Sequence, residues 1–153
     1  NPTIINNAIK FIYNPGISIM KESQIAIKSK NVSSMHDPTE GGLITGLEEL
    51  AMASNNGLYI NAEKIPIKNE TQLICNELNL NPLGLISSGS LIITCDSQYS
   101  NTLIKKITSA GINVNKIGKI TAKDKGLKLK IKDKVKNFPK FERDEIARYF
   151  ESK

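Results

Sequence analysis

The sequence contains no tryptophan, and aromatic residues make up only 5% of it, so it offers little surface for stacking nucleic-acid bases. It has one histidine, His36, and two cysteines, Cys75 and Cys95, which are too far apart for a C-x-x-C pair. A structural zinc site is therefore not indicated, and both cysteines are expected to be buried free thiols in a reducing, cytoplasmic compartment. Neither a run of about 20 apolar residues nor a secretory signal is visible, so no membrane association is expected.

The composition is typical of one globular domain. A chain of 153 residues with 39% hydrophobic and 24% charged residues is long enough to bury a core of its own. The first residue is Asn rather than Met, which suggests a fragment of a longer protein.

Much of the net charge of +6 comes from the segment 116–140. In residues 127–132 lysines alternate with apolar residues, which predicts a half-buried strand with its polar face in water. Lysines on an edge strand also discourage pairing with another chain. A basic surface suits phosphorylated ligands or nucleic acid, but the scarcity of aromatic residues argues against a nucleic-acid partner.

Predicted helices and strands alternate along the rest of the chain. Residues 1–13 are expected to be a lead-in segment plus a strand, and Met20 is expected to fill the core. A turn at 123–126 predicts a hairpin, and the apolar strand at 90–95 is expected to be central in its sheet. The remaining helices are predicted at 18–28, 69–78, 97–110 and 143–151, and the remaining strands at 58–60 and 114–121. This order predicts an α+β fold, a mixed sheet with helices packed on it in two or three layers.

The most informative stretch is Ser34–Leu43, Ser-Met-His-Asp-Pro-Thr-Glu-Gly-Gly-Leu. β-branched residues precede it and a helical pattern follows, which predicts a strand at 31–35, a turn, and a helix at about 39–54. Gly57 is expected to end that helix. Glu48 and Glu49 fall on its polar face and are expected to be solvated.

Two interpretations of this turn remain open. In the first, Asp37 and Thr39 cap the helix, and Gly41 and Gly42 only allow tight packing. In the second, free N–H groups at the helix N-terminus, beside glycines and hydroxyls, form an anion site. Asp37 then meets a metal or takes a proton.

The segments His36–Leu43, Ile86–Ile93 and Ile117–Ile120 each resemble a landmark of one family. The first resembles the D-x-T-x-G-G-L signature of the AIR synthase-related (PurM-like) superfamily, C-terminal domain, in the H-D-P-T-x-G-G-L form of its hydrogenase-maturation-factor-like members. The second resembles the S-G-x-L strand entry of that domain, and the third its I-G-x-V strand.

This resemblance implies a single α+β domain over residues 1–153, with a mixed β-sheet and helices on both faces in α/β/α layers. It also implies the C-terminal half of an ATP-dependent ligase, dehydratase or kinase, closing an active-site cleft. Residues 1–13 would lead in from a missing N-terminal ATP-binding domain. In relatives that domain supplies most ligands of ATP and Mg²⁺ and the homodimer interface, so the chain alone is expected to need no cofactor and to be inactive.

The resemblance also implies site residues. Asp37 is the candidate catalytic residue, and no metal ligand is assigned. The candidate contacts to a small-molecule substrate or its phosphate are His36, Thr39, Gly41, Gly42, Ser88 and Gly89. From the residues alone, Ser88 and Gly89 are equally well explained by a β-bulge or close packing, so both interpretations of that pair remain open.

One feature departs from the family pattern. The chain ends Phe150-Glu151-Ser152-Lys153, without the C-terminal cysteine that carries the thiocarboxamide in the hydrogenase-maturation dehydratase. The substrate is therefore left open. A non-catalytic metabolite-binding or regulatory module of the same fold is the main alternative, and a basic nucleic-acid-binding domain is a third.

Overall fold

The computed structural model describes residues 2–151 of the chain. Asn1 of the expected lead-in and the last two residues, Ser152 and Lys153, lie outside the described residues. The helices are α1 (Pro2–Lys10), α2 (Met20–Ile27), α3 (Gly42–Ser54), α4 (Asn69–Leu78), α5 (Ser100–Ser109) and α6 (Glu145–Glu151). The strands are β1 (Val32–His36), β2 (Gly57–Asn61), β3 (Ile92–Cys95), β4 (Gly118–Thr121), β5 (Leu127–Ile131) and β6 (Lys134–Asn137).

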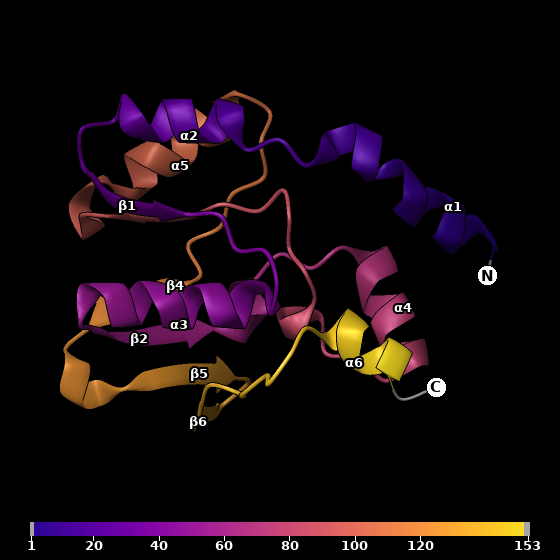
Figure 1. Cartoon of the computed structure of the whole chain (residues 1–153). Coiled ribbons are helices and arrows are strands. Elements are labelled where there is room, and N and C mark those ends of the chain that lie inside the picture. The colour runs from indigo at the N-terminus through magenta and orange to yellow at the C-terminus, as the bar shows by residue number, and fades with distance from the viewer. Residues whose placement is uncertain (1, 152–153) are drawn as a thin grey trace.

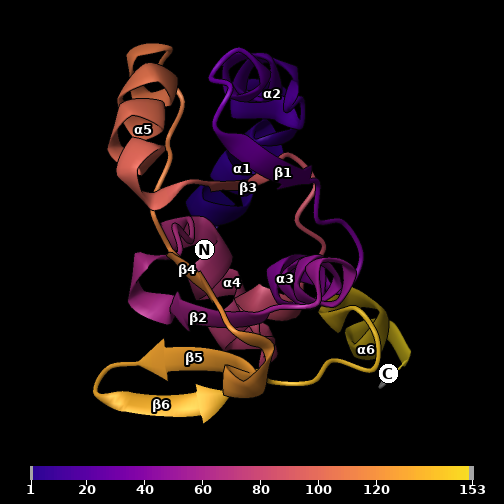
Figure 2. The same cartoon turned by 90° about the vertical axis from the view of Figure 1, so that its left-hand side faces the viewer.

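The strands form two sheets that lie on either side of α3. β1 and β3 make an antiparallel pair, and the other sheet has the order β4-β2-β5-β6. Figures 1 and 2 show α2 and α5 over one face of the β1–β3 pair and α3 between that pair and the larger sheet. The α+β class with mixed pairing is confirmed, although the strand at 90–95 is not central, because β3 pairs with β1 alone.

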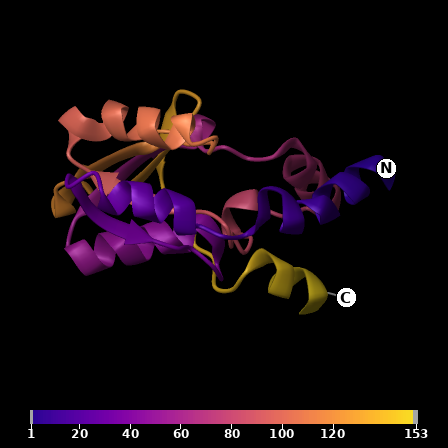
Figure 3. The same cartoon turned by 90° about the horizontal axis from the view of Figure 1, so that it is seen from above.

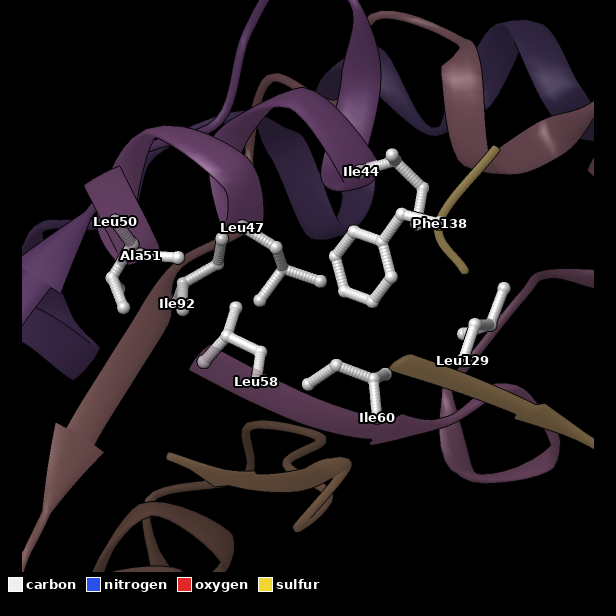
Figure 4. Packing of buried hydrophobic residues seen from close by; sticks show 9 residues of the cluster. All are labelled: Ile44, Leu47, Leu50, Ala51, Leu58, Ile60, Ile92, Leu129 and Phe138. Atoms are coloured by element: carbon white, nitrogen blue, oxygen red, sulfur yellow. The ribbon is translucent and has the colours of Figure 1, made fainter. Parts of the chain in front are cut away.

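The core lies around α3, whose apolar side chains recur at the spacing of one helix face. Figure 4 shows these side chains packed against residues of β2, β3 and β5. The buried members of this cluster are Ile44, Leu47, Leu50, Ala51, Leu58, Ile60, Ile92, Leu129 and Phe138. Because Ile92 comes from β3 and Leu58 from β2, α3 joins the two sheets into one core.

The order of the larger sheet corrects two predictions. The turn at 123–126 does not form a hairpin, because β4 and β5 lie on opposite sides of β2, antiparallel and parallel to it respectively. The hairpin is formed instead by β5 and β6. The lysine-rich strand β5 is therefore an inner strand, and β6 is the edge.

The N-terminal segment is helical, so the strand predicted within residues 1–13 is wrong. The apolar residues Ile4, Ala8 and Phe11 are spaced for one helix face and are half-buried, and α1 lies beside α4. Figure 3 shows α1, α4 and α6 gathered at one end of the molecule. Met20 is 62% exposed, so its predicted place in the core is also wrong.

Candidate functional site

The turn between β1 and α3 is shaped by two consecutive glycines. Gly41 is the N-cap residue of α3, with φ of 73°, and Gly42 follows with φ of 70°. Two left-handed residues in a row prevent the helix from starting earlier. The predicted start at Thr39 is therefore wrong, as is capping by Asp37 or Thr39, because the N-cap makes no side-chain hydrogen bond.

The same glycines permit a close approach of a second loop. A Cβ on Gly42 would lie 2.5 Å from the carbonyl oxygen of Leu85 and 2.7 Å from that of Leu83. Pro38 is fully buried, and a Cβ on Gly46 of α3 would lie 2.7 Å from the Pro38 Cβ. The turn is thus held between α3 and the loop that precedes β3.

A carboxylate distant in sequence occupies the start of α3. Asp144 Oδ2 accepts a hydrogen bond from the Gly41 N–H at 3.1 Å, and its Oδ1 accepts one from the Ile146 N–H at 2.8 Å. The anion position predicted at this helix N-terminus is therefore partly filled by the chain itself. Sequence reasoning missed Asp144, whose only local signal is its place just before α6.

The His36 side chain is positioned by two residues of α3. Its Nε2 lies 2.8 Å from Glu49 Oε2, and the two side chains are 34% and 58% exposed. Gly46 makes room for the ring, because a Cβ there would lie 3.2 Å from the His36 Cδ2. Glu49 is exposed as predicted, but it is also the hydrogen-bond partner of a candidate site residue.

Asp37 and Thr39 present their side chains to solvent. Among residues 2–151, the Asp37 carboxylate has no hydrogen-bond or ion-pair partner. The Thr39 carbonyl accepts the N–H groups of Gly42 and Ser87, each at 3.2 Å, so its backbone is fixed while its hydroxyl stays exposed. The turn therefore offers a free carboxylate and a hydroxyl on a rigid backbone.

The predicted segment Ile86–Ile93 contacts the turn through Ser87, which precedes the predicted site residues Ser88 and Gly89. Ser87 donates its N–H to the Thr39 carbonyl and its hydroxyl to the Pro38 carbonyl, at 3.2 and 3.3 Å. Ser88 is exposed. Gly89, with φ of 91°, packs so closely that a Cβ would lie 3.0 Å from the Ile17 Cα, which matches the close-packing interpretation of this glycine.

The part of the chain that the structure describes has neither a cluster of metal ligands nor a membrane-spanning helix. Residues 2–151 contain no cluster of three or more His, Cys, Asp or Glu side chains placed to hold a metal ion. Asp37 fits Mg²⁺ only as one ligand among phosphate oxygens and waters, which is how proteins commonly bind this ion. Over the same residues, no helix is both long and apolar enough to cross a membrane.

The two cysteines are free thiols, as predicted. Cys75 is buried and Cys95 is half-buried, and burial raises the pKa of both thiols above the ordinary value. A raised pKa keeps a thiol protonated and unreactive at neutral pH, so neither cysteine is a candidate nucleophile.

The fold is that of a known class of protein. A crystal structure of the hydrogenase maturation protein HypE in complex with ATP superimposes with a TM-score of 0.75 at 19% identity, over 84% of this chain and 42% of that one. The sequence profile of the family described as AIR synthase related protein, C-terminal domain, matches residues 17–130. The chain belongs to this family, which confirms the resemblance seen in the three motifs.

Sequence relatives point to one branch of that family. A putative hydrogenase expression/formation protein of Methanocaldococcus jannaschii is 35% identical over 98 residues, which is 63% of this chain and 29% of that protein. The carbamoyl dehydratase HypE of Rhizobium leguminosarum bv. viciae is 30% identical over 102 residues, 65% of this chain and 29% of that protein. The chain thus spans less than a third of the length of these two relatives.

Proposed function

We propose that this chain is the C-terminal half of an ATP-dependent enzyme related to the carbamoyl dehydratases, and that the turn between β1 and α3 faces its active-site cleft. The observation that carries the proposal is the Asp37 carboxylate. It is exposed, has no partner within residues 2–151, and stands on a turn whose backbone is fixed on both sides. Because the helix cap is Gly41, the structural role that could otherwise explain Asp37 is absent.

The turn residues take distinct roles in this proposal. Asp37 orients a ligand or takes a proton, which a positioned carboxylate does well. The Thr39 hydroxyl and the half-exposed His36 ring supply hydrogen bonds to a small-molecule substrate or its phosphate. Gly41 and Gly42 form the left-handed turn that presents these groups to the ligand, and Ser88 and Gly89 lie on the adjoining segment. The comparison structure contains ATP, which supports a nucleotide-using partner half.

An upstream half that binds ATP and Mg²⁺ is part of the same proposal. The sequence has no G-x-x-x-x-G-K-[ST] motif, and the two relatives are more than three times as long as the part that this chain matches. α1 and the irregular turn after it offer an apolar contact surface for that half. Its side chains Ile5, Ile9, Ile12 and Tyr13 are 52–84% exposed. An apolar stripe of this size is typical of a buried domain contact.

The test is ATP turnover by the full-length protein, measured as release of ADP and phosphate. Asp37→Asn is expected to lower Mg²⁺-dependent turnover by about a hundredfold, the usual loss for a positioned acid–base group. The matched control is Asp133→Asn, which makes the same change at an exposed aspartate in the turn between β5 and β6. This control is expected to keep the turnover of the unaltered protein.

Two outcomes would count against the proposal. Equal turnover by the Asp37→Asn protein and the control would remove Asp37 from the chemistry. No turnover by the full-length protein, with any substrate offered, would favour a metabolite-binding or regulatory module. The chain of residues 1–153 alone is expected to hydrolyse no ATP above the uncatalysed rate.

A further inference from the structure

One face of the larger sheet is left without a covering helix. α3 packs on the face that carries Leu58, Ile60 and Leu129, and Figure 2 shows no helix on the opposite side of this sheet in the part of the chain that the structure describes. Because side chains alternate along a strand, the register brings Lys119, Tyr59 and Lys128 into one row across that opposite face. Lys130 lies one row further on, beside Val135. These five residues define the outer sheet face.

Three lysines of the most basic part of the sequence, Lys119, Lys128 and Lys130, lie on this face. Segment 116–140 contains ten of the 21 basic residues and two of the 15 acidic ones. The net charge of this segment is therefore more positive than the net charge of the whole chain, which is +6 because the remaining residues are acidic on balance. The four strands contain five lysines and no acidic residue. Three of these lysines lie on the outer sheet face, whereas Lys134 and Lys136 pair with Ile131 and Leu129 and lie on the other face.

Few contacts within residues 2–151 neutralise the lysines of the outer sheet face. Lys128 Nζ donates a hydrogen bond to Asn137 Oδ1 at 2.7 Å, which holds the ammonium on the face without cancelling its charge. The ion pair nearest to these strands joins Lys125 to Asp124 in the turn before β5, at 3.9 Å and largely exposed. Unpaired lysines gathered on one open face create a positive potential that draws in negatively charged partners.

We propose that the outer sheet face binds an acidic surface of a partner protein, in a transient complex. Charge complementarity of this kind speeds association and selects partners more than it adds affinity. A second copy of the chain is excluded as the face-to-face occupant, because like charges would meet. A nucleic acid fits less well, because Tyr59 is the only aromatic side chain on the face and stacking dominates single-strand binding. A membrane surface also fits less well, because stable binding combines basic residues with inserted apolar side chains, and this face offers only Val135.

This surface is distinct from the one assigned above to an upstream half. The apolar stripe of α1 lies at the end of the molecule away from β5 and β6 (Figure 1). Permanent interfaces are apolar and transient ones are polar, so the two surfaces suit different kinds of partner. The inference does not depend on the proposed function.

The test uses a polyglutamate peptide of about 20 residues as the acidic probe and an oligothymidylate of the same length as the competing ligand. Backbone amide shifts of the ¹⁵N-labelled chain are followed during each titration. The test variant carries Lys119→Glu, Lys128→Glu and Lys130→Glu. The matched control carries Lys10→Glu, Lys28→Glu and Lys105→Glu, an equal charge change on exposed positions of or beside α1, α2 and α5.

The proposal predicts amide shifts confined to β2, β4, β5 and β6. It also predicts affinity for polyglutamate that falls about tenfold or more in the test variant and about twofold or less in the control. A triple glutamine variant at the same three lysines keeps the test valid if the glutamate variant fails to fold. Equal losses in test and control variants, or no binding at low salt, overturn the proposal. Tighter, lysine-dependent binding of the oligothymidylate would assign the face to nucleic acid instead.

Discussion

Gly42 contributes to the turn through both its backbone conformation and its lack of a side chain. Its φ of 70° disfavours any L-residue, and the carbonyl oxygens of Leu83 and Leu85 leave no room for a Cβ. Neither carbonyl can withdraw cheaply, because both belong to the backbone of the loop before β3. The glycine pair of the motif is thus required by the fold, whatever ligand the turn binds.

Gly42→Ala is therefore expected to lower the free energy of unfolding by about 2–4 kcal/mol, the range of backbone strain combined with overpacking. Gly111→Ala is the control, because Gly111 has φ of 80° with nothing within 4 Å of an added Cβ. The control is expected to cost about 1 kcal/mol, for the left-handed backbone alone. Guanidinium denaturation of both variants measures the difference, and equal losses would contradict the close approach at Gly42.

At the scale of elements, α6 is attached to the domain mainly by polar contacts. The helix was predicted at 143–151 with Ile146, Ala147 and Phe150 on an apolar face, but Ile146 is 40% exposed and Phe150 is 70% exposed. The buried residue is Glu145, which pairs with Arg148 and accepts the Asn81 N–H at 2.8 Å. Arg148 in turn donates to the Asn79 carbonyl, so α6 is tied to the loop after α4.

These contacts make the stability of α6 depend on pH. The hydrogen bond from Arg148 is the main reason that the pKa of Glu145 lies below its ordinary value of 4.5, and the Asn81 N–H adds to it while burial opposes it. A lowered folded-state pKa contributes stability that is present above pH 4.5 and is lost as the pH falls through the folded pKa.

Glu145→Gln is expected to destabilise the protein at neutral pH, by an amount that shrinks as the pH is lowered below 4.5. Urea denaturation from pH 7 down to about pH 3 measures this change. The same substitution at the exposed Glu142 serves as the control. The role of the ionised carboxylate would be refuted if the free energy of unfolding differed between Glu145→Gln and the unaltered protein by the same amount at every pH in this range.

Local sequence patterns predicted the strand at 127–132 but not which strands it pairs with. Alternation in residues 127–132 correctly predicted a half-buried strand, because burial on one face leaves a period of two in the sequence. The neighbours of that strand were predicted wrongly, since a short turn between β4 and β5 favours a hairpin locally. Parallel pairing of β5 with β2 depends on the core formed by Leu58 and Leu129, which are 71 residues apart.

At the scale of the whole molecule, α1 carries two apolar stripes, and only one of them packs against the rest of this chain. Ile4 and Ala8 are half-buried on the side of α4, where the Lys68 ammonium also lies 5.3 Å from the Phe11 ring. Ile5 and Ile9 form a second stripe that is more than half exposed. A helix that is apolar on two sides is typical of a buried position, which supports the proposed contact with an upstream half.

The double substitution Ile5→Glu and Ile9→Glu tests this contact, because its effect is expected to differ between the chain of residues 1–153 and the full-length protein. In the chain of residues 1–153 the double substitution is expected to raise solubility and to change the free energy of unfolding by less than about 0.5 kcal/mol, as for exposed sites. In the full-length protein it is expected to destabilise by about 2 kcal/mol or more, since two charges would be buried. Paired denaturation curves measure both effects, and a full-length protein that tolerates the change would contradict the proposed contact.

The sequence by itself determined the family, the α+β class, the main helices and the turn that carries Asp37 and Gly41–Gly42. These features are local, because helix and strand periodicity and a short motif are written in neighbouring residues. The tertiary structure alone decided the order of the strands, the split into two sheets, the contact of Asp144 with Gly41 and the pairing of His36 with Glu49. It also decided which surfaces stay uncovered, since each depends on groups that only the packed core brings together.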